Sequence, residues 1–381
     1  MGCPVKLGGK TLPEPLPDAK KRILQKIYLK ETLCQVTEHF KEYLFDCVEA
    51  ETGLRPRVFT INDVSRVKKF GRTGGVNLIS VQFGTDVGTQ SAKIAVKFFP
   101  SLEKTLEEAR KSRILRERFK NRQPPVPNTR TPKLLYTDPA SELLVYEGID
   151  GSEYLEADIP SVTKAFLVGR ALAAIHGPEV GEINLERYEG LVAMSTVRLP
   201  GAGSQLKDIL LNLFGKQIKL LTTSLGGTTP FGDLHDGNIL FSLKSSEFGM
   251  IKANPENVIT WIIDPEYLEE ASGVSRFEDI GIFFSIFFFQ EYERTNRISE
   301  TLRLLREFIR GYDTALQMWG APRLSTLYPD GLPINFDISL ALLVEGMDIM
   351  QRYGTNERTK EMYKKRVKFV LKLLNEDLIQ I

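Results

Sequence analysis

The 381-residue sequence predicts an α+β protein with two lobes, a small N-terminal lobe built on an antiparallel sheet and a larger, mainly helical C-terminal lobe. Three runs of β-forming residues, separated by glycine-containing turns, lie between residues 58 and 99. Beyond Gly151 most apolar residues recur at the spacing of helices. The chain is long and 42% apolar, which favours a substantial core and more than one domain. We expect three parts: an N-terminal arm with a helical extension (1–57), the sheet lobe (58–150) and the helical lobe (151–381).

The elements follow in order. Residues 1–17 are rich in Gly and Pro and predict a loose arm, and the apolar spacing of residues 18–50 predicts an amphipathic helix or helix pair. The runs VSRVKKF, VNLISVQFG and KIAVKFF predict a three-stranded antiparallel meander. SLEKTLEEARKSRILRERF then predicts a helix that ends at QPPVPN, and KLLYTD and ELLVYEGID predict two further strands.

In the helical lobe, NILFSL and VITWIID predict a hairpin, with the connection SLKSSEFGMIKANPEN as an elongated loop. The most apolar run, IGIFFSIFFF at 280–289, is about half the length needed to cross a bilayer, so we expect a buried helix.

Composition excludes some partners. The 50 Lys and Arg residues are balanced by 49 Asp and Glu, which leaves no field strong enough to hold a nucleic acid or an anionic membrane. Three scattered cysteines without metal-ligand spacing fit reduced thiols in the cytoplasm. The opening MGCPVKLGG lacks the layout of a secretory signal and has Lys6 where myristoylation requires Ser or Thr. We expect a cytoplasmic protein that binds neither nucleic acid nor membrane.

The stretch FGDLHDGNIL, residues 231–240, carries the strongest chemical signal. Asp233 and Asn238 are five positions apart, the spacing at which one loop of a phosphoryl-transfer enzyme presents a carboxylate to an acceptor hydroxyl and a carboxamide oxygen to Mg²⁺. Mg²⁺ requires a further hard oxygen ligand, and Asp264 at the end of VITWIID supplies it.

The sheet lobe offers groups for phosphate. Lys97 in IAVKFF can place an ammonium on phosphate oxygens, and either Glu107 or Glu108 on the following helix can hold that ammonium as an ion pair. In GRTGGVN, Gly74 and Gly75 let backbone amides approach phosphate. The segment EGIDG at 147–151 is expected to be a hinge between the lobes whose backbone meets a purine edge.

Taken together, the motifs resemble the aminoglycoside phosphotransferase and choline kinase family, kinase-like enzymes that phosphorylate small molecules. The resemblance covers about residues 60–290 and rests on GGVN, AVKFF, VYEGIDG, LVGRALAAIHG, GDLHDGNIL, IIDPEY and FEDIG. It implies a protein-kinase-like bilobal fold, ATP with Mg²⁺, and transfer of the γ-phosphate to a hydroxyl of a small molecule.

The resemblance also implies roles for individual residues. Asp233 would be the catalytic base, with His235 ordering the loop, and Asn238 and Asp264 would hold the metal. The residues implied for nucleotide binding are Gly74, Gly75, Asn77, Lys97, Glu108, Glu147 and Ile149.

Three other positions carry expectations. The family usually has His where this chain has Phe231, so we expect packing to replace a hydrogen bond that anchors the loop. Asp279 in FEDIG is expected to brace the catalytic loop, and His176 to be a packing or capping residue.

Three functions remain open. They are a kinase of small alcohols, sugars or amino alcohols, a nucleotide-binding pseudokinase regulator, and a protein Ser/Thr kinase. All four residues whose loss would indicate a pseudokinase are present, namely Lys97, Asp233, Asn238 and Asp264. A protein kinase would have a long activation segment closed by Ala-Pro-Glu, whereas fourteen residues without that motif separate Asp264 from Asp279.

Overall fold

The computed structural model describes residues 45–46, 48–49, 53–57, 60–70, 76–86, 88–140, 142–179, 181–196, 203–224, 227–243, 255–268, 273–328, 332, 334–354 and 356–375. Most of the predicted helical extension, the turn GRTGG and much of the predicted long loop after residue 243 lie outside these ranges.

The N-terminal lobe is a five-stranded antiparallel sheet, as predicted. Its strands are β1 (Thr60–Phe70), β2 (Val76–Thr85), β3 (Gly88–Phe98), β5 (Leu134–Asp138) and β6 (Leu143–Glu147), in the spatial order β1-β2-β3-β6-β5. The predicted helix is α3 (Leu102–Asn121), which packs against β5 and β6. The Ser101 side chain accepts a hydrogen bond from the Lys104 backbone N–H at 3.3 Å and so caps this helix.

A second, smaller sheet joins the two lobes. It has the order β4 (Thr129–Arg130), β10 (Val258–Ile262), β9 (Ile239–Leu243) and β7 (Ser152–Glu153), and β9 and β10 are antiparallel as predicted. The two-residue strands β4 and β7 were not predicted, because a strand of two residues has no alternation to detect. A third sheet pairs β8 (Gly227–Thr228) with β11 (Val274–Ser275). The segments just before β9 and just after β10 are thereby held side by side.

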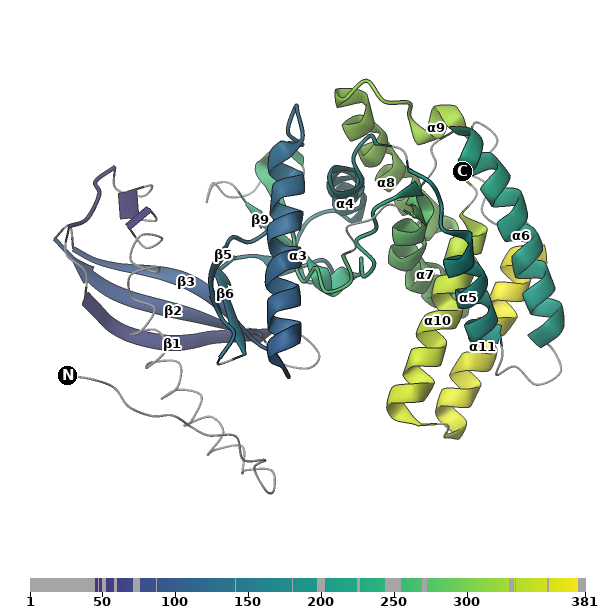
Figure 1. Ribbon diagram of the computed structural model, residues 1–381, viewed down its shortest axis with the longest axis horizontal. Coiled ribbons are helices and arrows are strands. Elements are labelled where there is room, and N and C mark those ends of the chain that lie inside the picture. Colours follow the sequence, from purple (N-terminus) through teal and green to yellow (C-terminus); the bar gives the residue numbers. More distant parts are fainter. Residues whose placement is uncertain are drawn as a thin grey trace.

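The C-terminal lobe is helical, and Figure 1 shows it at the opposite end of the molecule from the five-stranded sheet, with α3 and β9 between them. Short 3₁₀ turns, η1 (Asp236–Asn238) and η3 (Pro255–Asn257), directly precede β9 and β10. The helices of this lobe are α4 (Ser161–His176), α5 (Leu185–Thr196), α6 (Gly203–Ser224), α7 (Arg276–Thr295), α8 (Ser299–Met318), α9 (Leu324–Leu327), α10 (Asn335–Tyr353) and α11 (Glu357–Asn375).

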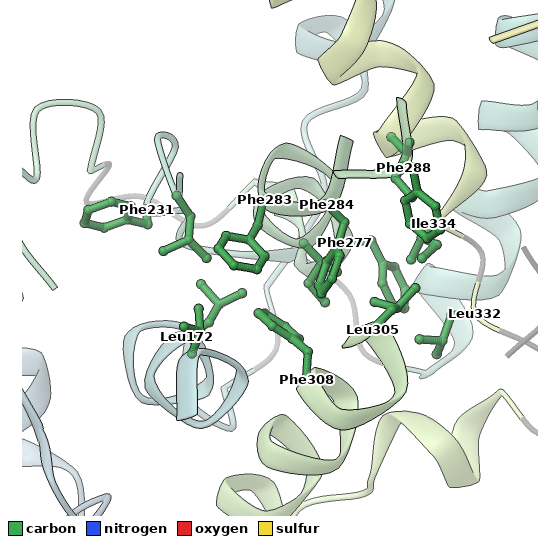
Figure 2. Close-up of a cluster of buried hydrophobic side chains, with 14 of the residues drawn as sticks. Leu172, Phe231, Phe277, Phe283, Phe284, Phe288, Leu305, Phe308, Leu332 and Ile334 are labelled. Carbon is green, nitrogen blue, oxygen red and sulfur yellow. The ribbon is translucent and has the colours of Figure 1, made fainter. Parts of the chain in front are cut away.

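The core of this lobe is rich in aromatic rings. The run IGIFFSIFFF lies within α7, and its Phe283 and Phe284 rings contact the Phe308 ring of α8 at centroid distances of 5.7 and 5.2 Å (Figure 2). The prediction of a buried helix is confirmed, because Phe283, Phe284 and Phe288 are at most 1% exposed. Among the described residues, no helix is both long and apolar enough to span a membrane.

Helices α4 and α8 cross at two glycines. A Cβ atom on Gly169 would lie 1.9 Å from the carbonyl oxygen of Phe308, and one on Gly311 would lie 1.9 Å from the carbonyl oxygen of Phe166. The two backbones therefore pack directly against each other at this crossing. The C-terminal end of α4 carries His176, whose Nδ1 atom lies 2.8 Å from the hydroxyl of Tyr312 on α8.

Candidate active site

The segment Phe231–Asn238, which contains the candidate base Asp233, is anchored at its start by Asp279. The Asp279 carboxylate accepts hydrogen bonds from the backbone N–H groups of Phe231 and Gly232, each at 2.7 Å. The Phe231 side chain is fully buried in the core, so packing replaces the hydrogen bond that a histidine would make, and Asp279 braces the loop. Both features agree with the expectations from the sequence. Gly232 has φ of 83°, and a Cβ there would lie 2.8 Å from the Tyr267 backbone, so glycine is required.

Asp279 is itself held by His176. The His176 Nε2 atom lies 2.9 Å from the Asp279 carboxylate, and Nδ1 lies 2.8 Å from the Tyr312 hydroxyl. Since a carboxylate only accepts, Nε2 carries the proton. Burial lowers the pKa of His176 despite the neighbouring Asp279 charge, which favours the neutral ring. Arg276 donates to the Tyr312 hydroxyl at 3.0 Å and completes this buried network. The sequence predicts a packing or capping role for His176, whereas the structure shows that it also holds Asp279 and Tyr312 by hydrogen bonds.

Asp233 and Asn238 lie together at the two ends of one turn. The Asn238 side-chain amide donates to the Asp233 backbone carbonyl at 3.0 Å and to its carboxylate at 3.2 Å. His235 caps the turn by accepting from the Gly237 N–H at 3.0 Å, and its Nε2 lies 3.6 Å from the Asp233 carboxylate. Burial, reinforced by the charges of Asp264 and Glu266, raises the pKa of Asp233 to about 6 although His235 and Asn238 oppose the shift. The Asp233 side chain remains 35% exposed, so a hydroxyl group can reach it.

Asp264 lies two residues beyond the end of β10, and its carboxylate contacts Lys97 of the sheet lobe. Its backbone has φ of 58°, a left-handed conformation that is uncommon for a residue with a side chain and that aims the carboxylate toward the sheet lobe. The Lys97 ammonium of β3 donates to the Asp264 carboxylate at 2.5 Å and to the Glu108 carboxylate at 2.9 Å. One cation thus bridges two carboxylates across the interface between the lobes.

The orientation of α3 against the sheet decides whether Glu107 or Glu108 pairs with Lys97. Glu108 is 3% exposed and contacts Lys97, whereas Glu107 is 50% exposed and pairs with Lys111 at 2.7 Å. Burial raises the pKa of Glu108 to about 7, and the Asp264 charge adds to this, although Lys97 acts in the opposite direction. Burial also lowers the pKa of Lys97, but the two carboxylates outweigh this effect and the pKa is raised. The ammonium therefore stays charged.

The expected hinge lies between β6 and β7. The Gly148 N–H donates to the Lys93 carbonyl at 2.9 Å, and a Cβ on Gly148 would lie 2.3 Å from the Lys93 backbone, so the hinge presses directly on β3. The Glu147 carboxylate accepts from the Lys133 N–H at 2.8 Å and is engaged within the sheet lobe. Within the described ranges, no hydrogen bond is made by the Ile149 N–H, which leaves a donor for a ligand at the hinge.

The turn that the sequence predicts to bind phosphate is only partly described. Asn77 pairs with Val96 in the β2–β3 ladder, one position from Lys97, which pairs with Val76. Gly74 and Gly75 lie outside the described residues, and their role in phosphate binding stays a prediction.

The residues present fit a nucleotide-bound Mg²⁺ ion. No cluster of three or more His, Cys, Asp or Glu side chains that could hold a metal alone occurs in the described part of the chain. Asp264 and Asn238 supply two hard oxygens. The Asn238 amide nitrogen makes both contacts to Asp233, and in the described chain the Oδ1 atom has no hydrogen-bond partner, so it is available to a metal ion. Mg²⁺ is commonly held by one or two protein ligands together with substrate phosphates. The Asp264 carboxylate already contacts one cation, the Lys97 ammonium, so it lies where positive charge is bound.

No protein-family model matches the sequence, and no curated protein matches it. Among solved structures, an ethanolamine kinase from Plasmodium vivax is similar over 83% of this chain and 83% of its own, with a TM-score of 0.51 and 12% sequence identity. This chain has the fold of that kinase. The predicted α+β, kinase-like bilobal fold is thereby confirmed.

Two other kinases are similar with lower TM-scores. A choline kinase from Streptococcus pneumoniae is 14% identical, with 88% of this chain and 99% of that chain covered and a TM-score of 0.45. A microcompartment-associated aminopropanol kinase is 12% identical, with 88% and 99% covered and a TM-score of 0.49.

Proposed function

We propose that this protein is an ATP- and Mg²⁺-dependent kinase that transfers the γ-phosphate to a hydroxyl of a small molecule. The observation that carries the proposal is the bridge formed by Lys97 between Glu108 and Asp264, next to the hydrogen-bonded pair of Asp233 and Asn238. Packing alone does not require this combination of charged groups. A buried or half-buried charge costs free energy, and such groups concentrate at functional sites.

Each group has a role in binding or proton transfer. Lys97, positioned by Glu108, would contact the nucleotide phosphates, and Asn238 and Asp264 would hold Mg²⁺. When bound, Mg²⁺ supplies positive charge that stabilises the phosphate oxygens during transfer. The Ile149 N–H would meet the purine edge at the hinge, with Gly74, Gly75 and Asn77 along the phosphates and Glu147 in the hinge.

Asp233 would orient the acceptor hydroxyl and accept its proton. The acceptor oxygen forms a bond to the γ-phosphorus, the bond between that phosphorus and the β,γ-bridging oxygen breaks, and ADP leaves with that bond's electron pair. The proton of the hydroxyl passes to the Asp233 carboxylate. A pKa near 6 suits a base that works at neutral pH, because the carboxylate is ionised yet more basic than an ordinary aspartate.

Two alternatives are less well supported. A pseudokinase regulator would have no need for the base and metal ligands, and Asp233, Asn238 and Asp264 are all in place. A protein kinase would need a platform for an extended peptide, and fourteen residues between Asp264 and Asp279 leave little chain to build one. A small hydroxylated molecule requires only a pocket.

The test offers γ-labelled ATP with Mg²⁺ to a panel of amino alcohols including ethanolamine, sugars and other small alcohols. A denatured proteome is offered in parallel. We expect label to pass to a small molecule in the wild-type protein and to be lost in Asp233→Asn. Efficient labelling of protein serines or threonines with no labelled small molecule would instead establish the protein-kinase alternative.

A pseudokinase is distinguished by a separate measurement. It would bind Mg-ATP without transferring label to any acceptor, and Asp233→Asn would leave its behaviour unchanged. The wild-type protein and this variant should therefore be compared by calorimetry with a non-hydrolysable ATP analogue as well as by label transfer.

A further inference from the structure

A cavity of about 470 Å³ lies between α8 and α9, outside the candidate active site. One wall is a stripe along α8 with the spacing of successive helical turns, and it includes Arg306, Arg310 and Gln317. The other wall is formed by α9 and its flanks, including Arg323 and Tyr328. In Figure 1 α9 lies at the top of the helical lobe, away from the five-stranded sheet. The volume is within the usual range for small-molecule sites, roughly 300–1,000 Å³.

Three arginines give this cavity a cationic rim. Arg310 pairs with Glu307 at 2.5 Å, and its guanidinium lies 5.1 Å from the Phe166 ring. Arg323 donates through Nε and Nη2 to the side-chain oxygen of Gln317 when that amide is oriented to accept. Arg306 makes no ion pair or hydrogen bond within the described chain. Arg306 thus presents a guanidinium group that no carboxylate of the described chain contacts, and Arg323 keeps its Nη1 group as a donor.

Asp313, the one acidic residue among those that line the cavity, already accepts hydrogen bonds from other residues of the chain. The Asp313 carboxylate accepts from the Leu324 N–H at 2.6 Å, and from the N–H and hydroxyl of Ser325 at 3.2 and 2.6 Å. These three bonds tie α8 to the start of α9 and hold the second wall in place. Asp313 therefore shapes the cavity, while its oxygens are committed to donors from α9.

The floor is apolar. Ile309, Tyr328 and Leu332 are buried, and they lie beside the hydroxyl groups of Thr314 and Ser325. Guanidinium groups match the planar or tetrahedral oxygens of carboxylates and phosphates with paired hydrogen bonds. We propose that this cavity binds a small organic oxyanion, a phosphate ester or carboxylate whose apolar body rests on the floor while Arg306 and Arg323 hold its charged end.

The cavity is separate from the proposed catalytic groups, but residues that line or adjoin it contact the residues that hold those groups in place. The Tyr328 ring packs against Phe277, near the start of α7, with centroids 5.5 Å apart. Tyr312, adjacent to Asp313 on α8, faces the other way and hydrogen-bonds with His176. None of the proposed catalytic or nucleotide-binding residues lines the cavity. The site is therefore testable whether or not the proposed kinase function holds.

The test measures binding by titration calorimetry and thermal shift at constant ionic strength, with sodium chloride compensating each addition. The probes are phenyl phosphate, benzoate, inorganic phosphate and, as an uncharged control, benzyl alcohol. The variants are Arg306→Gln and Arg323→Gln. The matched control is Arg303→Gln, which changes an exposed arginine on the same helix that pairs with Glu300 and does not line the cavity.

We expect saturable binding of phenyl phosphate or benzoate, with Kd raised about 10-fold or more in each cavity variant, as for loss of a hydrogen bond to a charged group. Arg303→Gln should bind as the wild type does. A preference between the two aromatic anions identifies the phosphate or carboxylate class. Absence of saturable binding by every anion would overturn the proposal, as would equal Kd values in wild type, Arg306→Gln and Arg323→Gln. Melting curves without probe confirm folding, and Arg306→Lys, which keeps the charge, should restore part of the affinity.

Discussion

Replacing Glu108 by Gln should make the protein more stable at alkaline pH and less active. Glu108 is almost fully buried, and its pKa is raised from 4.5 to about 7, mainly by burial. A group whose pKa is higher in the folded protein favours folding when protonated. Its contribution is therefore greatest below pH 4.5 and is lost as the pH rises to 7. Glutamine has a similar shape and carries no charge at any pH, so the variant lacks this loss.

The size of the effect follows from the pKa shift. A difference of 2.5 between 4.5 and about 7 corresponds to about 3 kcal/mol at 1.36 kcal/mol per pKa unit. This value is the upper limit of the increase in the free energy of unfolding that Glu108→Gln should show over wild type above pH 7. Such an increase is possible even though the variant loses the ion pair with Lys97, because the free-energy cost of removing two charges from water can exceed the attraction between them. Activity should fall, since Lys97 loses the carboxylate that positions it opposite the nucleotide.

The measurement is urea unfolding at pH 5 and pH 8, for wild type, Glu108→Gln and the matched control Glu107→Gln. Glu107 is half exposed, and its hydrogen bond and ion pair with Lys111 lower its pKa below the usual value. Its replacement should therefore leave the pH dependence between pH 5 and pH 8 unchanged. The reasoning would be refuted if Glu108→Gln were less stable than wild type at pH 8 while being equally stable at pH 5. Equal behaviour of the two glutamine variants would also contradict it.

Further expectations concern the base, the metal and the helix crossing. Asp233→Asn should lower turnover about 10²-fold or more with ATP affinity nearly unchanged in calorimetry, because general-base catalysis typically contributes 10²–10⁴. In the wild type, kcat/KM should fall as the pH drops below about 6, where Asp233 takes up a proton; a profile flat to pH 5 would remove it as the base. Asp264→Ala should abolish the Mg²⁺ dependence of nucleotide binding, and equal Mg-ATP affinity in calorimetry would contradict its role as a ligand. Gly169→Ala should cost roughly 1–3 kcal/mol in urea unfolding by overpacking, whereas Gly190→Ala, with no atom within 4 Å of the added Cβ, should be neutral or stabilising.

Much of the fold could be predicted because its signals are local. Runs of seven to nine β-forming residues between glycine-containing turns predicted the long strands. Helical spacing of apolar residues predicted α3, and a long apolar run predicted α7. The two-residue strands β4 and β7 could not be predicted, since they exist only because β10 and β9 provide partners. The same limit applies to the cavity between α8 and α9, whose walls are joined by hydrogen bonds between Asp313 and residues eleven and twelve positions away.

In the candidate site, contacts between residues close in the sequence could be predicted, whereas contacts between distant residues could not. Asp233 and Asn238 could be paired from the sequence because they are five positions apart, a distance that a single turn closes. His235 was placed in the loop for the same reason. The link from His176 to Asp279 spans 103 residues and left no local pattern, so its role became visible only in the folded chain.

The sequence by itself determined which chemical groups this protein carries and which of them share a loop, because spacing along the chain sets distances over a few residues. The tertiary structure alone decided which groups meet across the lobes. Lys97 and Asp264 are 167 residues apart, and their contact depends on the sheet lobe docking against the end of β10. The choice between Glu107 and Glu108 was likewise tertiary. Adjacent residues on a helix point about 100° apart, so only the packing of α3 on the sheet determines which carboxylate is buried against Lys97 and which faces water.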